Sequence, residues 1–230
     1  MGRYKYLFWD IDGTVIDFKA AEKAAIKALF VKFGLGDCPD EKVAKYSAIN
    51  DRYWKALEKG EMTKPQILVE RFREFFESEG IDPSLAEAFN ADYQVALGDT
   101  VVFCDDAYDI LLEQKGTYEL IAITNGTEIA QRKKLSGSGL DKVFDGIYIS
   151  EIIGTEKPNK GFFEAVLNSL KIENTSEILI IGDSLTSDIL GGINMGIDTC
   201  WYNPGGKEND SEIRPTYVIR NLHEIENIVG

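Results

Sequence analysis

The 230-residue sequence predicts an α/β protein whose parallel sheet is interrupted by an all-helical insertion. Two observations support this prediction. In the second half, strand-like segments alternate with helical segments of about a dozen residues, which indicates βαβ units with right-handed crossovers. Residues 17–97 show helical periodicity without a convincing strand, and they follow directly after the first strand.

The first predicted strand is Tyr6–Trp9, where apolar and aromatic side chains occupy four successive positions. It runs into the stretch DIDGT, residues 10–14. In extended backbone, residues i and i+2 face the same side, so we expect Asp10 and Asp12 to point together while Ile11 points into the protein. Two neighbouring carboxylates repel each other, so this arrangement predicts a cation between them.

Within the insertion, helical periodicity covers residues 19–34, 40–60, 63–80 and 84–97. Thr63 followed by Gln66 is a capping-box pattern, and Gly60 and Gly80 are typical helix ends. We therefore expect a core formed by residues 1–16 and 98–230, with residues 17–97 as a second domain. The sheet is expected to resume near Val101.

After the insertion, four strands are predicted at 118–124, 144–150, 177–183 and 197–203, and a shorter one at 216–220. Helices are predicted at 127–139, 159–170, 187–196 and 221–229. Continuous apolar strands such as 178–181 suit a sheet that is covered on both faces. The glycines of GGINMG, residues 191–196, favour close packing of helix on sheet, because they lie inside a helical pattern.

Composition excludes several classes of protein. The formal net charge of −14 argues against a polynucleotide partner, because such binding relies on Lys and Arg. Apolar runs are too short to span a bilayer, and the start of the chain leaves no room for a secretory signal. Three widely spaced cysteines predict reduced thiols in a cytoplasmic protein. A single histidine, His223, makes His-dependent triads and zinc sites improbable. The sequence is compatible with a monomer and with a homodimer.

Ligands of open parallel sheets bind beyond the carboxyl ends of the strands, and four strands here carry polar residues at that end. These are DIDGT at 10–14, TNG at 124–126, the loop with Lys157, and Asp183 followed by Asp188. Each has an ordinary explanation: turns for the first two, a surface lysine for the third, and acids at a helix N-terminus for the last. Their recurrence at the same end of successive strands favours one site.

The chemistry of such a site suits phosphate transfer. Two carboxylates about 4 Å apart repel by about 4 kcal/mol at an effective dielectric near 20, so Asp10, Asp12 and Asp183 need a counterion, and oxygen ligands suit Mg²⁺. The Lys157 ammonium and the Thr124 hydroxyl can hold a phosphate. One Asp carboxylate can attack phosphorus, and a second can protonate the leaving oxygen and then deprotonate the hydrolytic water.

These residues resemble the haloacid dehalogenase superfamily of phosphatases, whose successive motifs all occur here in order. The resemblance implies a doubly wound core with an inserted helical cap. It implies Asp10 as nucleophile and Asp12 as general acid and base. Mg²⁺ would be held by Asp10, the Asp12 carbonyl and Asp183, with Asp188 in support. The residues expected to bind the substrate phosphate are Thr14, Thr124, Asn125, Gly126 and Lys157.

The second aspartate indicates a phosphatase, because true dehalogenases of the superfamily lack it. The stretches at 46–72, 149–167 and 182–203 look like the noncanonical pyrimidine 5′-nucleotidase branch, which implies a small nucleoside monophosphate as substrate. Asn50, Tyr53 and Trp54 are expected to stack on or hydrogen-bond the base, with ordinary helix packing as the alternative.

Other functions stay open from the sequence. A phosphatase of the same fold could act on phosphoglycolate or a sugar phosphate. A receiver-like phosphoacceptor module would need a strand-end aspartate where Thr124 stands, and it would leave the large insertion unexplained. A non-catalytic binding protein would require vestigial carboxylates, yet none of the expected carboxylates is missing.

Overall fold

The computed structural model describes residues 2–230 and divides into two compact units. Of the described residues, unit 1 comprises 2–17, 102–128 and 138–230, and unit 2 comprises 18–101 and 129–137. No helix within the described part of the chain is long and apolar enough to cross a bilayer.

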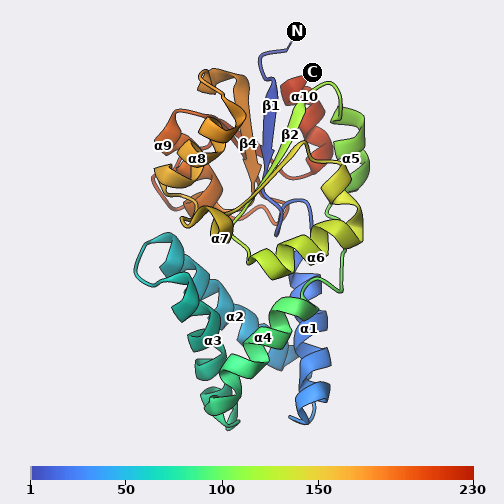
Figure 1. Ribbon diagram of the computed structural model, residues 1–230, viewed down its shortest axis with the longest axis vertical. Helices are drawn as coiled ribbons and strands as arrows, with labels where there is room; N and C mark the ends of the chain where they lie inside the picture. The colour runs from blue at the N-terminus through green and yellow to red at the C-terminus, as the bar shows by residue number, and fades with distance from the viewer. Residues whose placement is uncertain (1) are drawn as a thin grey trace. The chain divides into compact units, whose positions relative to one another are not determined.

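Unit 1 is built on a six-stranded sheet in the order β3-β2-β1-β4-β5-β6, in which every adjacent pair is parallel (Figure 1). The strands are β1 (Tyr6–Trp9), β2 (Glu119–Thr124), β3 (Gly146–Ile149), β4 (Ile178–Gly182), β5 (Asp198–Tyr202) and β6 (Tyr217–Ile219). This order is that of a doubly wound fold, in which successive strands are added first to one side of β1 and then to the other. The six strands that the sequence predicts by residue range are all present.

Helices cover both faces of the sheet. Figure 1 shows α8 and α9 on one side of the strands and α5 and α10 on the other. The helices of this unit are α5 (Ala107–Gln114), α7 (Ser150–Ile153), α8 (Lys160–Leu170), α9 (Leu190–Met195) and α10 (Glu226–Val229). Helix α8 lays Phe162, Phe163 and Val166 against Phe8 and Ile180, and the alternation along β1 turns Leu7 and Trp9 to the opposite face. The sheet is therefore buried on both sides, as its continuous apolar strands predict.

Two glycines bring α9 close to its neighbours. A Cβ on Gly191 would lie 2.4 Å from the Phe163 ring, and one on Gly192 would lie 2.3 Å from Cγ2 of Thr199 in β5. Only a residue without a side chain fits at either position. The predicted role of GGINMG in helix–sheet packing is thereby confirmed. The helix predicted over 187–196 is not uniform, because a π-turn at Leu185–Ile189 precedes α9.

The prediction that the sheet resumes near Val101 is wrong. Phe103 forms an isolated bridge with Ile16, and the main-chain N–H of Asp17 donates to the Val102 carbonyl at 2.8 Å. Residues 102–104 therefore pair with the chain that follows β1 and do not join the sheet. The left-handed conformations of Asp105 and Asp106 (φ 40° and 59°) then lead into α5, a helix that the sequence analysis missed.

Unit 2 is a helical bundle of α1 (Phe18–Phe33), α2 (Asp40–Glu58), α3 (Lys64–Glu79) and α4 (Ala86–Ala96), joined by most of α6 (Glu128–Ser138). The predicted capping box begins α3, where the Thr63 N–H donates to Oε1 of Gln66 at 2.9 Å. Gly80, with a φ of 67°, ends the same helix. From α6, the Lys133 ammonium forms an ion pair with Asp99 and donates to the Val95 carbonyl at 3.1 Å.

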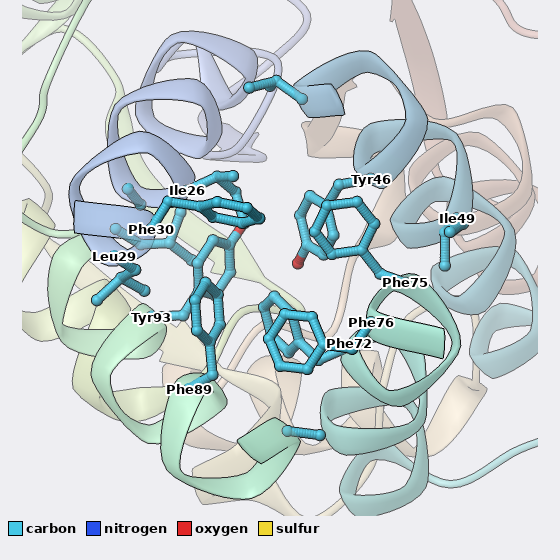
Figure 2. Packing of buried hydrophobic residues seen from close by; sticks show 14 of the residues in the cluster. Ile26, Leu29, Phe30, Tyr46, Ile49, Phe72, Phe75, Phe76, Phe89 and Tyr93 are labelled. Carbon is cyan, nitrogen blue, oxygen red and sulfur yellow. The ribbon is translucent and has the colours of Figure 1, made fainter. Parts of the chain in front are cut away.

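The core of unit 2 is unusually aromatic (Figure 2). The Tyr46 and Phe72 rings stack with centroids 4.9 Å apart, and Phe89 meets Phe76 edge to face at 5.0 Å. Tyr93 from α4 joins the same cluster at 5.0 Å from Phe72. Such aromatic pairs add about 0.5–1.5 kcal/mol each to the stability gained from burial. This shared core shows why the insertion is compact without a strand.

Candidate active site

The site lies at the carboxyl ends of β1 and β4, where the strand order reverses. A doubly wound sheet opens a crevice at this point, because the connections from the two strands leave toward opposite faces. Trp9 is in register with Ile181, and the Asp10 N–H donates to the Ile181 carbonyl at 2.9 Å. The ladder therefore extends one residue past β1, and Asp10 and Asp183 follow neighbouring strands.

The chain turns at once after Asp10. The Val15 and Ile16 N–H groups both donate to the Ile11 carbonyl, at 3.1 and 2.9 Å, and Gly13 has a φ of 96°. The regular strand thus ends before Asp12, which forms an isolated parallel bridge with Ile16, and Ile11 is fully buried as expected. A Cβ on Gly13 would lie 2.7 Å from Oδ2 of Asp183, so the loop after β1 packs against the residue after β4.

Lys157 reaches Asp10 from a loop after β3. Its ammonium donates to Oδ1 of Asp10 at 2.8 Å, to Oδ1 of Asp188 at 2.7 Å and to the Ile123 carbonyl at 2.9 Å. The side chain is almost completely buried. A buried ammonium is costly unless carboxylates and hydrogen bonds surround it, and here its three hydrogens have such partners. The structure therefore brings together residues that are 147 positions apart in the sequence.

The stretch TNG helps to hold this arrangement. The Asn125 side chain accepts from the Lys157 N–H and donates to the Lys157 carbonyl, both at 2.9 Å. The Gly126 N–H donates to the Thr124 hydroxyl at 3.1 Å, and Thr124 itself is buried at the end of β2. Asn125 thus fixes the main chain of Lys157, a role that the sequence analysis did not foresee for a residue placed at the phosphate.

Two more side chains restrain the carboxylates. The Thr14 hydroxyl donates to Oδ2 of Asp10 at 3.2 Å. Oδ2 of Asp188 accepts from the Ser184 N–H at 3.1 Å, while its other oxygen binds Lys157. Both oxygens of Asp188 are therefore engaged within the protein, so this residue is placed to support the site by holding Lys157.

Three carboxylates come together among the described residues. Ligand oxygens of Asp10, Asp183 and Asp188 lie within 4.8 Å of one another. One ammonium, that of Lys157, leaves this group with a net negative charge. Hard oxygen donors at such spacing are the donor set that Mg²⁺ prefers, so the residues fit a divalent cation.

The shared charge also shifts the pKa values. Burial raises the pKa of Asp10 to about 7, Lys157 opposes the shift, and the Asp188 charge adds to it. Burial also raises the pKa of Asp183 well above its ordinary value, and repulsion from Asp10 and Asp188 raises it further. For Lys157, burial alone would lower the pKa, but the carboxylates of Asp10 and Asp188 raise it above its usual value. Added positive charge would therefore keep Asp10 ionised.

The predicted base-contacting residues lie in α2 of unit 2. Asn50 is only 1% exposed, and its side chain is used at both ends: Nδ2 donates to Glu22 at 3.1 Å and Oδ1 accepts from Arg71 at 2.6 Å. Helix packing therefore accounts for Asn50. Tyr53 and Trp54 are partly exposed, and the Trp54 indole donates to Oδ1 of Asn50 at 3.2 Å.

Some residues of the site had no signal in the sequence. Ser187 lies 3.4 Å from the Asn125 amide, and the Ile123 carbonyl accepts from Lys157. The Trp201 indole donates to the Asp183 carbonyl at 2.9 Å from the neighbouring strand β5. Lys207 lines the same pocket as Asp183. Trp201 lies in the predicted strand 197–203, and Lys207 follows it. No local pattern in the sequence shows that the two side chains lie near Asp183.

Comparisons with known proteins agree with this geometry. A family model described as haloacid dehalogenase-like hydrolase matches residues 7–202. HAD-hydrolase YfnB from Bacillus subtilis (strain 168) is 38% identical over 230 residues, which cover 100% of this chain and 97% of YfnB. The crystal structure of YfnB bound to magnesium matches with a TM-score of 0.91 at 37% identity and covers 98% of each chain.

Two further relatives are named pyrimidine 5′-nucleotidases. PynA from Streptococcus pneumoniae is 36% identical over 225 residues, 96% of this chain and 93% of PynA. YjjG from Escherichia coli (strain K12) is 31% identical over 228 residues, 99% of this chain and 98% of YjjG. The fold class and the resemblance inferred from the motifs are thereby confirmed.

Proposed function

Since the chain belongs to the haloacid dehalogenase-like hydrolase family, we propose that this hydrolase is a Mg²⁺-dependent phosphatase of pyrimidine nucleoside 5′-monophosphates. The observation that carries the phosphatase proposal is the contact between Lys157 and Asp10, 2.8 Å long and shielded from water beside two further carboxylates. A carboxylate next to an ammonium at a cation site has what attack on a phosphate requires.

The proposed cation would be held by Asp10, Asp183 and the main-chain carbonyl of Asp12. Bound there, Mg²⁺ supplies positive charge that draws the phosphate to the site and offsets the charge developing on its oxygens. Asp188 contributes indirectly, because its oxygens already bind Lys157 and the Ser184 N–H. Its ordered carboxylate keeps the ammonium beside Asp10.

In the first step, an Asp10 oxygen attacks phosphorus. The bond between phosphorus and the ester oxygen of the substrate breaks, and an aspartyl-phosphate forms on Asp10. The Thr14 hydroxyl, 3.2 Å from Oδ2 of Asp10, orients the carboxylate. Lys157 stabilises its ionised form and attracts the phosphate. The Thr124 hydroxyl accepts from Gly126, so its own hydrogen can be donated to a phosphate oxygen.

Asp12 is the proposed general acid and base. It protonates the leaving ester oxygen in the first step and thereby becomes a carboxylate. It then takes a proton from the water that attacks phosphorus, and the bond between phosphorus and Asp10 breaks. Both side chains return to their starting protonation states, and the products are inorganic phosphate and a nucleoside.

The substrate class rests on the two relatives named pyrimidine 5′-nucleotidases, each of which this chain matches over nearly its whole length. The test is release of phosphate, with Mg²⁺, from dUMP, dTMP, purine monophosphates, phosphoglycolate and sugar phosphates. We expect the highest kcat/KM with the pyrimidine nucleotides. Turnover of phosphoglycolate or sugar phosphates without turnover of pyrimidine nucleotides would support the proposed phosphatase activity but contradict the proposed nucleotide substrate. No turnover of any phosphate ester would reject both.

We also propose that unit 2 is the substrate-selecting cap and that Tyr53 and Trp54 contact the base. An aromatic ring stacked on a base contributes about 1–3 kcal/mol. Trp54→Ala should therefore raise KM for dTMP by about tenfold or more while leaving turnover of p-nitrophenyl phosphate, which has no nucleobase, unchanged. Equal effects on both substrates would contradict base contact. We further propose a cytoplasmic location, with which three free cysteine thiols are compatible.

A further inference from the structure

The peptide group between Asp183 and Ser184 is held at both ends. Its carbonyl accepts a hydrogen bond from the Trp201 indole at 2.9 Å, and its N–H donates to Oδ2 of Asp188 at 3.1 Å. A peptide group is planar, so two bonds on opposite ends fix the rotation of the whole unit. The main chain from which the Asp183 carboxylate extends is thereby restrained.

Trp201 is well placed to provide a fixed donor. It lies in β5 in register with Gly182 of β4, and it is only 6% exposed. The indole is therefore attached to a buried strand of the sheet, which holds it more rigidly than a surface loop would. It also lines the same pocket as Gly13 and Asp183.

Gly13 restricts the carboxylate from the other side. A Cβ there would approach Oδ2 of Asp183 to 2.7 Å, so the bare main chain of the loop after β1 already lies against the carboxylate. Asp183 is thus confined by its own peptide group and by Gly13. A ligand held in one orientation binds a cation without first losing side-chain freedom.

We infer that Trp201 is a positioning residue for Asp183, through a hydrogen bond that orients this carboxylate toward the cation. Without the indole N–H, the Asp183 carbonyl loses a buried donor and the peptide group is held at one end alone. The inference rests on the proposed metal site but not on the identity of the substrate.

The test measures Mn²⁺ binding directly, by the loss of the electron paramagnetic resonance signal of free Mn²⁺ during titration of the full-length protein. Trp201→Phe should weaken Mn²⁺ binding by about tenfold, the effect of removing a group that orients a metal ligand. Tyr202→Phe is the matched control: it removes one hydrogen bond from the next residue of β5, the 2.8 Å contact to Asp105. Its Mn²⁺ affinity should stay that of the unchanged protein.

A second variant separates the hydrogen bond from the size of the ring. Benzothienylalanine at position 201 keeps the bicyclic ring but carries sulfur in place of N–H, and it should weaken Mn²⁺ binding as Trp201→Phe does. If Trp201→Phe does not fold, this substitution decides the result. At saturating Mg²⁺, kcat should recover in both variants.

Three results would be decisive. Unchanged Mn²⁺ affinity in the benzothienylalanine protein would overturn the role of Trp201. An equal loss in Tyr202→Phe would also overturn it, because general loosening of β5 would then explain both variants. Failure of the unchanged protein to bind Mn²⁺ would instead reject the metal site on which the proposed function depends.

Discussion

Asp183→Asn should stabilise the metal-free protein while removing a ligand of the proposed metal site. Ligand oxygens of Asp10, Asp183 and Asp188 lie within 4.8 Å of one another. One pair of unit charges at that distance repels by about 3.5 kcal/mol at an effective dielectric of about 20. The Lys157 ammonium offsets one of the two neighbouring charges, so Asp183 faces about one net negative charge. Its removal should therefore relieve repulsion on the order of 3 kcal/mol.

For a chain of this length, about 1 kcal/mol corresponds to about 2–4 °C in the unfolding midpoint. We expect Asp183→Asn to unfold several degrees higher than the unchanged protein in EDTA, on the order of 6–12 °C. The effect should depend on pH. Because the folded state raises the pKa of Asp183 above 3.8, the folded protein binds its proton more tightly than the unfolded chain. Ionisation of Asp183 therefore lowers the free energy of unfolding of the unchanged protein as pH rises above 3.8. The difference in unfolding midpoint between Asp183→Asn and the unchanged protein should grow with pH.

Thermal unfolding monitored by circular dichroism measures this effect. Asp141→Asn is the control, because it makes the same change of charge at an exposed site and should shift the midpoint little. Adding Mg²⁺ should raise the midpoint of the unchanged protein and leave that of Asp183→Asn where it was. A metal-free Asp183→Asn protein that unfolds at or below the temperature of the unchanged protein would refute the repulsion argument.

Four further outcomes are expected. Asp10→Asn should lower kcat by about 10⁴-fold or more without changing the circular dichroism spectrum, since the proposed nucleophile is lost at nearly constant volume; near-normal activity would contradict its assignment. EDTA should stop phosphate release and excess Mg²⁺ should restore it, whereas undiminished rates would count against the metal. Gly192→Ala should cost about 1–3 kcal/mol in urea unfolding, because its Cβ would meet Thr199. Arg71→Leu should cost about 2–4 kcal/mol, because Asn50 loses a buried charged donor, and an unchanged urea midpoint would show that this bond is unimportant.

Local patterns were sufficient for the frame of unit 1. Continuous apolar segments become central strands because both faces of the sheet are covered, so Tyr6–Trp9 and Ile178–Gly182 could be identified from their side chains alone. The convergence of Asp10, Lys157 and Asp183 could also be predicted, since the carboxyl ends of parallel strands meet at one edge.

The structure of segments that depend on contacts distant in the sequence could not be predicted from local patterns. Residues 101–104 resemble a strand, but Val102 and Cys104 pair with the chain after β1 instead of the sheet. The two hydrogen bonds that join the Asn125 side chain to the main chain of Lys157 had no signal in the sequence. Asn50 carries no mark in the sequence that distinguishes a buried hydrogen-bonding residue from an exposed one.

The sequence by itself determined which segments form the sheet and which polar residues follow its strands, because the period of the apolar side chains and the polar residues after each strand are local properties of the chain. Tertiary structure alone decided how those residues are held. The three hydrogen bonds of Lys157, the close approach of Gly13 to Asp183 and the indole of Trp201 on the Asp183 carbonyl all join segments that meet only after folding. A hydrogen bond depends on distances of a few tenths of an ångström, and no local pattern encodes such distances between remote parts of a chain.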